Sequence, residues 1–229
     1  MDAQEILDQL KAQSNPDAVA GMSHFGIQGQ EMYGISMPTL RKIAKDIGKD
    51  HQLAVDLWAS GVHEARILAT LVDVPKSVTE AQMEQWVQDF DSWDVCDQCC
   101  MNLFGKTAFA QAKVVEWSGH EEEFVKRAAF ALMATLAVHD KKAEDSQFER
   151  WLPLIKRAAT DERNFVKKAV NWTLRQIGKR NLALNAAAIQ AATEIETIDS
   201  KSARWIAKDA LRELTSEKMQ QRLTEKARQ

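Results

Sequence analysis

A segment with three carboxylates and a tryptophan, DSWDVCD at residues 91–97, is the first candidate for chemistry in this chain. Asp91 or Ser92 can cap the N-terminus of a helix, which accounts for part of the acidity without any function. Asp97 is not explained in that way. It follows Trp93 by one helical turn, so we expect the carboxylate and the indole to lie on one face, where a carboxylate can stabilise a positive charge.

A second candidate is a cationic stripe farther along the chain. Four residues follow one another at steps of four, three and four positions: Lys168, Trp172, Arg175 and Lys179. This spacing keeps their side chains on one face of a helix. Lysine and arginine on such a face can bind phosphates while a tryptophan packs on a sugar or a base. The pattern is also typical of a solvated basic face whose tryptophan packs against a neighbouring helix, so Trp172 alone does not decide between these interpretations.

The segments around the stripe repeat. FVKRA at residues 124–128 returns as FVKKA at residues 165–169, 41 positions later, and more weakly as WIAKD at residues 205–209. This period is typical of HEAT-like helix pairs, in which we expect the aromatic and aliphatic residues to pack toward the neighbouring repeat. The basic residues two positions after the aliphatic one would then align as a ladder across one surface: Arg127, Lys168 and Lys208.

Composition favours helices over the whole length. Ala, Leu, Lys, Gln and Glu dominate, and only four prolines and nine glycines occur. Pro38 suits the first turn of a helix that ends near Gly48, and the pair at residues 161–162 suits the start of a helix that runs to Gly178. HEARI at residues 63–67 is a candidate divergent repeat, and its offset from the copy at residues 124–128 implies an extra helix between them.

We therefore predict an all-α fold. It is a right-handed solenoid of HEAT-like helical repeats that forms a single domain over residues 1–229, with one basic, tryptophan-bearing inner surface. No run of residues is a convincing strand.

The net charge of −3 conceals an uneven distribution. Residues 1–150 hold 14 Lys and Arg against 24 Asp and Glu, whereas residues 151–229 hold 16 against 9. A basic C-terminal part can dock on a phosphate backbone while the acidic part stays in solvent, because salt screens such fields over roughly 10 Å. An ordinary solvated helical surface explains the same charges equally well.

Three cysteines lie within five residues, at Cys96, Cys99 and Cys100, too close together for a long-range disulfide framework. We interpret them as buried helical residues in a reducing compartment, since a structural zinc site needs four ligands and no histidine is near in sequence. The five histidines form no spaced motif, and we assign them no chemistry. With no signal peptide and no apolar run that could span a membrane, we expect a cytoplasmic protein that binds no metal.

Three segments together resemble the DNA alkylation repair glycosylases of the AlkD-like, HEAT-repeat type: WDVCD at residues 93–97, VKRA at residues 125–128 and KAVNWTLR at residues 168–175. The resemblance covers nearly the full length, with the segments in that family's order and approximate spacing. It implies a monofunctional enzyme that hydrolyses the N-glycosidic bond of cationic alkylated purines, such as N3-alkyladenine or N7-alkylguanine, in duplex DNA. It also implies a concave DNA-binding face without a deep base-flipping pocket, and no cofactor.

By position, the resemblance assigns roles to individual residues. Asp97 corresponds to the catalytic carboxylate, and Trp93 and Trp172 to the tryptophans that pack against the deoxyribose and backbone at the lesion. Arg127 corresponds to a phosphate contact near the lesion. Phe25 stands where the best-studied members have an aromatic hydroxyl, so a stacking role survives and a hydroxyl hydrogen bond does not. The other DNA-binding residues that we predict are basic: Lys168, Arg175, Lys179 and Lys208.

Two other functions are open at this point. The family contains relatives with little or no glycosylase activity that bind unusual DNA structures, so a non-catalytic DNA-binding solenoid explains the same basic ladder. A protein-interaction scaffold follows from the solenoid form alone, because a fold does not fix a function. For the leading hypothesis we expect a monomer whose partner is duplex DNA carrying alkylated bases, with no membrane involved.

Overall fold

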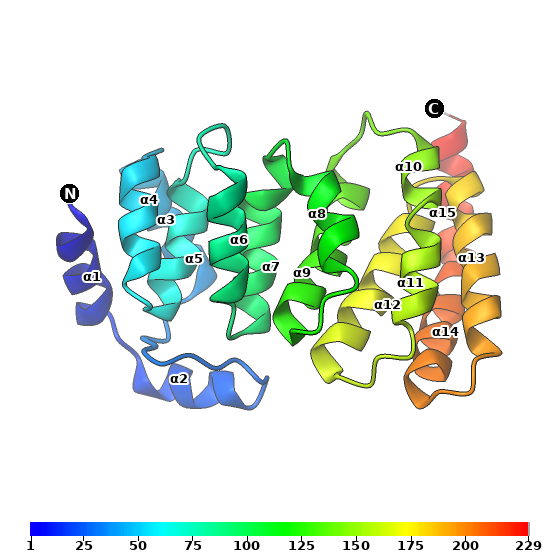
Figure 1. Ribbon diagram of the computed structural model, residues 1–229, viewed down its shortest axis with the longest axis horizontal. Coiled ribbons are helices and arrows are strands. Elements are labelled where there is room, and N and C mark those ends of the chain that lie inside the picture. The colour runs from blue at the N-terminus through cyan, green and yellow to red at the C-terminus, as the bar shows by residue number, and fades with distance from the viewer. Residues whose placement is uncertain (229) are drawn as a thin grey trace. The chain divides into compact units, whose positions relative to one another are not determined.

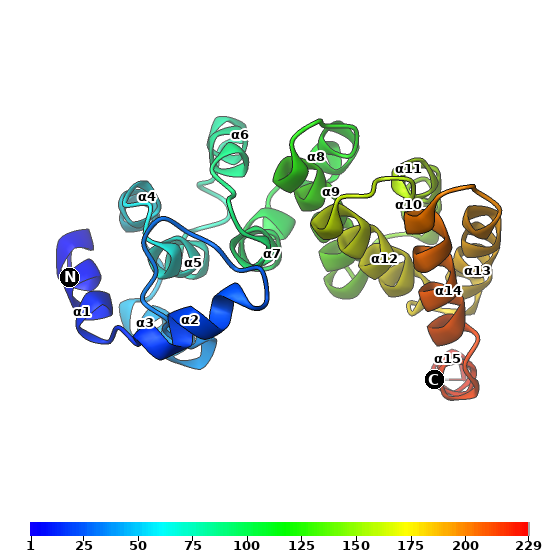
Figure 2. The ribbon, with the colours of Figure 1, turned by 90° about the horizontal axis from the view of Figure 1, so that it is seen from below.

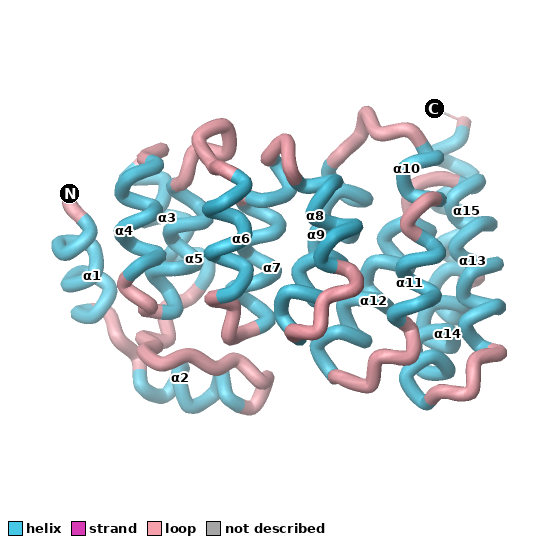
Figure 3. Tube along the Cα trace, in the orientation of Figure 1, coloured by secondary structure: helices cyan, strands magenta, loops and turns pink. Residues whose placement is uncertain are grey.

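The computed structural model describes residues 1–228, which form helices joined by connections of varied length (Figure 1, Figure 3). The chain divides into two compact units, Met1–Ala110 and Gln111–Gln229. The all-α prediction is confirmed, since the only β-type pairing within residues 1–228 is an isolated bridge between Glu31 and Val62. The single domain predicted over residues 1–229, with its concave face, stays a prediction.

The first unit contains seven α-helices and one short 3-10 helix. They are α1 (Ala3–Ala12), α2 (Pro16–Ser23), α3 (Met37–Ile47), α4 (His51–Ala59), α5 (His63–Val72), α6 (Glu80–Gln88), α7 (Trp93–Asn102) and η1 (Phe104–Lys106). Helix α8 (Ala110–Trp117) begins at the boundary. The second unit continues with α9 (Glu123–His139), α10 (Asp145–Glu149), α11 (Leu152–Ala158), α12 (Asn164–Gly178), α13 (Leu182–Glu196), α14 (Lys201–Leu214) and α15 (Glu217–Ala227).

Two layers of helices build the first unit. Helices α3, α5 and α7 pack side by side, and α4 packs against α5 from the other layer (Figure 2). Trp58 of α4 and Trp86 of α6 stack with ring centroids 4.0 Å apart and planes 2° from parallel, which joins the two helices of that outer layer. The Trp58 indole N–H donates to Asp89 at 2.9 Å, so the ring is buried without leaving its polar atom unsatisfied.

The second unit repeats this arrangement with longer inner helices, α9, α12 and α14. Helix α12 packs against α9 on one side and α14 on the other, while α11 and α13 form the outer layer (Figure 2). Buried polar side chains bridge the inner helices: the Thr173 hydroxyl donates to the carbonyl of Phe130 at 2.6 Å, and the Asn171 amide donates to the carbonyl of Ile206 at 3.2 Å. Each bond pairs a polar group that would otherwise be buried alone, so it favours one register between repeats.

The predicted packing between repeats is confirmed for the first two copies, whereas Trp205 of the third copy is 42% exposed. The rings of Phe124 and Phe165 stack with centroids 5.5 Å apart, and Val125, Val166 and Ile206 are buried. Toward the N-terminus the repeat is shorter, because α5, α7 and α9 begin 30 residues apart, at positions 63, 93 and 123. Helices α6, α7 and α8 all lie between α5 and α9, so the offset of residues 63–67 reflects a complete further helix pair, and the prediction of one extra helix is wrong.

The boundaries of α3 and α12 can be compared with those predicted from the sequence. Helix α3 begins at Met37 with Pro38 in its first turn, and it ends at Ile47, followed by the C-cap residue Gly48, whose φ of 84° suits glycine. Helix α12 begins at Asn164, later than predicted, since Arg163 is its N-cap residue. Asp161 instead binds Arg163 at 2.6 Å and Lys126 at 3.0 Å. Burial alone would raise the pKa of Asp161, but these two cations outweigh it and hold that pKa well below its usual range.

Candidate catalytic carboxylate and candidate nucleic-acid interface

Helix α7 carries both Trp93 and Asp97. Ser92 is its N-cap residue, but the serine hydroxyl makes no capping bond and donates instead to Asp94 at 2.5 Å. Trp93 is the first residue of the helix and is half-buried, whereas Asp97, one turn later, is only 8% exposed. A carboxylate with so little exposure interacts strongly with any charge that approaches it, because little water screens the field.

Asp94, the neighbouring carboxylate on α7, is held by a histidine. His63 of α5 is 2% exposed, and its Nε2 donates to Asp94 Oδ2 at 2.9 Å. Burial alone would lower the pKa of His63 and raise that of Asp94. The bond and the opposite charges outweigh burial, so the pKa of His63 is raised and that of Asp94 is lowered. The pair joins α5 to α7 and helps to fix the helix that carries Asp97.

Sequence reasoning missed this pair. His63 and Asp94 occupy neighbouring positions at the starts of α5 and α7, 31 residues apart. That separation is one residue more than the 30-residue repeat of the first unit, which was not recognised because only the 40-residue repeat of the C-terminal part was visible. A search for partners one short repeat apart would have found it.

The connection between α2 and α3, residues 24–36, positions Phe25. The Trp93 indole N–H donates to the carbonyl of Phe25 at 3.1 Å, which joins one end of the connection to α7. Near the other end, the buried Glu64 carboxylate accepts bonds from three successive backbone N–H groups, at residues 33–35. The Phe25 side chain itself is 74% exposed. The structure thus brings together Phe25 and Trp93, residues predicted as separate contacts.

The glycine at position 34 makes this anchoring possible. Its φ is 72°, and its N–H donates to Glu64 at 2.6 Å. A Cβ at this position would lie 2.5 Å from the backbone oxygen of Asn15. Only glycine combines this conformation with this close approach of two backbone segments.

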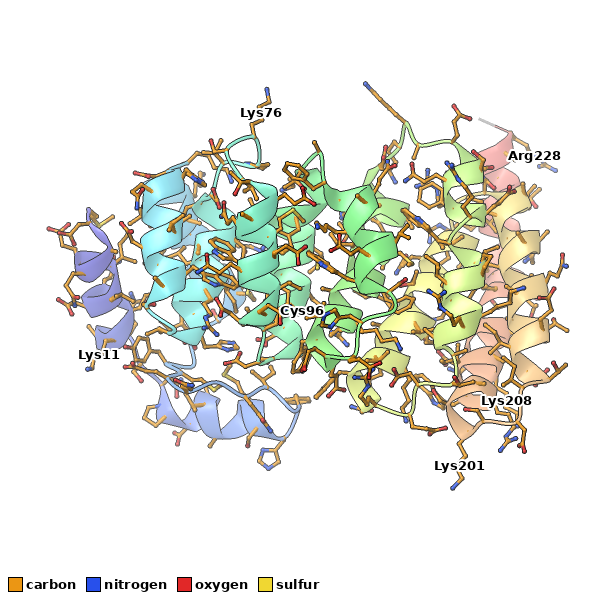
Figure 4. The ribbon with its side chains drawn as sticks, in the orientation of Figure 1. Lys11, Lys76, Cys96, Lys201, Lys208 and Arg228 are labelled. Atoms are coloured by element: carbon orange, nitrogen blue, oxygen red, sulfur yellow. The ribbon has the colours of Figure 1, made fainter. Side chains whose placement is uncertain are left out.

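The three cysteines are buried in α7, as predicted. Cys96, Cys99 and Cys100 form no disulfide and have no exposed surface, and Figure 4 labels Cys96. Burial raises the pKa of the Cys99 thiol well above its usual range, which keeps it protonated and unreactive. Residues 1–228 contain no group of three or more histidine, cysteine or acidic side chains that could hold a metal ion.

The cationic stripe of α12 divides into two parts. Lys168 is exposed and has no ion pair or side-chain hydrogen bond with any described residue, and Trp172 is half-buried. Arg175 and Lys179, toward the C-terminal end, bind the carboxylate of Glu213 on α14 at 2.6 and 3.0 Å. These two cations hold the pKa of Glu213 below its usual value against the effect of its partial burial. The stripe is therefore open at Lys168 and partly neutralised beyond Trp172.

The ladder of equivalent basic residues is uneven. Lys208 of α14 is exposed, like Lys168 (Figure 4). Arg127 of α9 is only 5% exposed, and its guanidinium donates to the carbonyl of Phe165 at 2.6 Å. The neighbouring helix thus draws Arg127 inward, and at least one of its five N–H donors serves the contact between α9 and α12.

Charge differs between the two units. Met1–Ala110 holds 8 Lys and Arg against 16 Asp and Glu, whereas Gln111–Gln229 holds 22 against 17. The open cations Lys168 and Lys208 thus belong to the unit with the positive balance, and the carboxylates of α7 to the acidic one.

Comparison with known proteins decides the family. Residues 6–214 match the family described as DNA alkylation repair enzyme. The chain belongs to this family. The nine residues predicted for the site, from Phe25 to Lys208, all lie within the matched range, whereas α15 lies beyond it.

Relatives of this DNA alkylation repair family member are distant. A protein of Listeria innocua serovar 6a, described as uncharacterized, is 24% identical over 191 residues, which cover 82% of this chain and 83% of the relative. A solved structure matches with a TM-score of 0.78 at 19% identity, covering 93% of this chain and 95% of the other. That protein is described as one of a new family related to the HEAT-like repeat DNA glycosylases, with affinity for branched DNA structures. The likeness confirms the HEAT-like fold.

No helix of this family member within residues 1–228 combines the length and apolar character needed to cross a bilayer.

Proposed function

We propose that this member of the DNA alkylation repair family is a glycosylase that releases cationic alkylated purines, such as N3-alkyladenine and N7-alkylguanine, from duplex DNA. The observation that carries the proposal is Asp97, a carboxylate with 8% exposure one turn after Trp93 on α7. Asp94 of the same helix is held by His63, so we propose Asp97 and not Asp94 as the catalytic carboxylate.

The chemistry needs little besides charge stabilisation. A cationic purine is a good leaving group: when the bond from C1′ to the base nitrogen breaks, its electron pair stays with the base, which departs neutral. The sugar becomes an oxocarbenium-like cation, and water adds at C1′ and loses a proton. A carboxylate stabilises the developing charge or orients the water, as in glycoside hydrolysis. Asp97 takes this role in the proposal, and no covalent lysine intermediate or metal is required.

Aromatic faces assist the same step. An indole attracts a cation by roughly 0.5–2 kcal/mol, and this applies to the cationic purine and to the sugar that it leaves. Trp93 has its polar edge bonded to the carbonyl of Phe25, so the orientation of its ring is fixed before DNA arrives. Trp172 packs against the DNA backbone in this proposal, and the exposed Phe25 supplies a stacking surface.

Duplex DNA is bound through phosphate contacts in this proposal. Lys168 and Lys208 are supported most strongly, because both are exposed and neither is paired with a carboxylate of the described chain. Arg175 and Lys179 must exchange Glu213 for a phosphate, and Arg127 must reach one while bonded to Phe165. We therefore rank the exposed lysines first as sources of binding energy and these three residues second.

The test is release of free base from methylated duplex DNA by the wild type, Asp97→Asn and Asp94→Asn. Asparagine has nearly the shape of aspartate, so Asp97→Asn removes the charge and little else. We expect base release to fall by about 100-fold, the typical effect of removing one group that stabilises charge in a transition state, while DNA affinity stays within a few-fold. Asp94→Asn removes the same charge from the same helix and should retain most of the activity where thermal melts show it folded. Equal release by the wild type and Asp97→Asn would contradict the role of Asp97.

A second candidate is non-catalytic binding of DNA. It is favoured by the structural relative, described as having affinity for branched DNA, and by the open cations Lys168 and Lys208. In that case the wild type releases no base, yet it binds DNA with an affinity that falls with salt and falls further in Lys168→Ala. Lys201→Ala, which removes another exposed lysine of the second unit, is the matched control.

A further inference from the structure

A cationic pocket lies in the second unit, where the C-terminal ends of α9 and α12 face α15. Its volume is about 490 Å³. Five cationic side chains line it: Lys141, Lys179, Arg180, Arg222 and Lys226. The only carboxylate among its lining residues is that of Asp145. The pocket belongs to a different part of the surface from the open lysine of α12, because Lys168 and Lys179 are separated by about 16 Å of helix.

Few of these charges are balanced by the protein. Lys179 is paired with Glu213, and the two oxygens of Asp145 accept bonds at 2.9 Å from the amide of Asn181. Lys141 and Arg222 are exposed, and within residues 1–228 their side chains make no ion pair or hydrogen bond. Both therefore have all their donors available to a ligand.

The other two cations are held in place by neutral acceptors. The Arg180 guanidinium donates to the carbonyls of Ala137 at 2.5 Å and Asp140 at 3.0 Å, and its face lies 4.0 Å from the Phe148 ring. The Lys226 ammonium donates to the carbonyl of Arg180 at 2.5 Å. Carbonyls orient these groups but do not neutralise them, and Lys226 keeps two further N–H donors.

Mutual repulsion among these cations favours the binding of an anion. Partial burial lowers the pKa of Lys226, and the positive charges of Lys141, Arg180 and Arg222 lower it further. The pKa of Arg180 is also lowered by burial, although nearby carboxylates act in the opposite direction. A bound anion would relieve both the repulsion and the cost of burial.

We infer that this pocket binds phosphate. Arg222 offers a planar fork suited to two phosphate oxygens, while Lys141 and Lys226 supply point charges. The volume suits a diphosphate or a nucleotide-sized ligand, and the openness toward Lys141 and Arg222 also admits a phosphodiester of DNA held by the same unit. Arg222 and Lys226 lie on α15, outside the range that matches the DNA alkylation repair family, so the family match does not account for this site. It does not depend on base excision.

The test compares the double variant Lys141→Ala/Arg222→Ala with the control Lys201→Ala/Lys218→Ala. Both remove two exposed cations of the second unit, and none of the four side chains has a partner among the described residues, so neither variant should disturb folding. Binding of inorganic pyrophosphate is measured by calorimetry, and binding of a short unmodified duplex by fluorescence anisotropy over a series of salt concentrations.

Two results support the inference and identify the source of the phosphate. If the ligand is a small phosphate, the wild type and the control bind pyrophosphate, and the pocket variant loses at least about tenfold in affinity. If it is the DNA backbone, pyrophosphate binds weakly to all three proteins. The pocket variant then loses DNA affinity, and the slope of the logarithm of its binding constant against the logarithm of the salt concentration becomes shallower by up to about 1.8, or about 0.9 for each lost phosphate contact. If the pocket variant and the control match in both assays, the inference is wrong, whether or not the wild type releases base.

Discussion

Replacing Glu213 by glutamine tests whether the C-terminal part of the α12 stripe belongs to the DNA interface. Glu213 accepts from Arg175 at 2.6 Å and from Lys179 at 3.0 Å, and its side chain is 30% exposed. Glutamine keeps the size of the side chain and removes its charge. Lys179 then becomes available to a phosphate without first releasing a carboxylate, and Arg175 keeps only a longer ion pair with Asp209 at 3.6 Å.

The size of the effect follows from the two ion pairs. A solvent-accessible pair contributes about 0.2–1 kcal/mol, so losing both should lower the free energy of unfolding by on the order of 1 kcal/mol. In the wild type, DNA binding through these cations must break the two ion pairs, and in the variant it need not. A difference of about 1 kcal/mol corresponds to roughly fivefold tighter binding. If both cations then contact phosphates, the slope of the logarithm of the binding constant against the logarithm of the salt concentration steepens by up to about 1.8. The variant should thus be less stable and bind DNA more tightly.

Fluorescence anisotropy of a labelled duplex over a salt series measures affinity and slope, and urea denaturation measures stability. Glu225→Gln is the matched control, because it removes an exposed carboxylate of α15 that has no side-chain partner among the described residues. If Glu213→Gln loses stability but binds DNA with the affinity and slope of the control, Arg175 and Lys179 serve only to join α12 to α14. The stripe would then end at Trp172.

Two further predictions concern stability. Because the pKa of His63 is raised in the folded state, its contribution to the free energy of unfolding is complete below about pH 6.5 and is lost as pH rises through the folded-state pKa. The pKa of Asp94 is lowered, so the contribution of Asp94 to the same free energy is lost only in acid. Urea denaturation should therefore show unfolding free energy falling from pH 6 toward pH 9 in the wild type more steeply than in Asp94→Asn, and equal slopes would exclude the pair as the cause. Gly178→Ala should lower the unfolding free energy by about 1–3 kcal/mol, because the new Cβ would lie 2.7 Å from both methyl groups of the buried Leu214. Gly119→Ala, where nothing lies within 4 Å of the added atom, should cost much less, and urea denaturation of both variants measures the difference.

Local patterns predicted the helices well. The spacing of apolar residues, Pro38 and Gly48 marked α3 correctly, and the recurrence of FVKRA predicted the packing of Phe124 against Phe165. These features depend on residues within one helix or on equivalent positions in neighbouring repeats. Both kinds of information are present in a single sequence.

Contacts between helices were harder to predict. The spacing of Lys168 and Arg175 placed them on one face, but it could not show that Glu213 of another helix pairs with one and leaves the other open. Likewise Arg127 and Lys168 hold equivalent positions in two repeats, yet Arg127 turns inward because the carbonyl of Phe165 lies within 2.6 Å. Whether a cation faces solvent is decided by which acceptor the adjacent helix offers, and sequence periodicity carries no information on that.

The charge of the two units limits how the proposed enzyme can bind DNA. Met1–Ala110 carries twice as many acidic as basic residues, so its long-range field repels a polyanion. Affinity must therefore come mainly from the basic unit, through residues such as Lys168 and Lys208. The acidic unit contributes Asp97, whose negative charge is unfavourable toward phosphates but favourable toward a cationic base or sugar. In the proposed function, that opposition gives selectivity for a positively charged lesion, because intact DNA offers Asp97 no cation to stabilise.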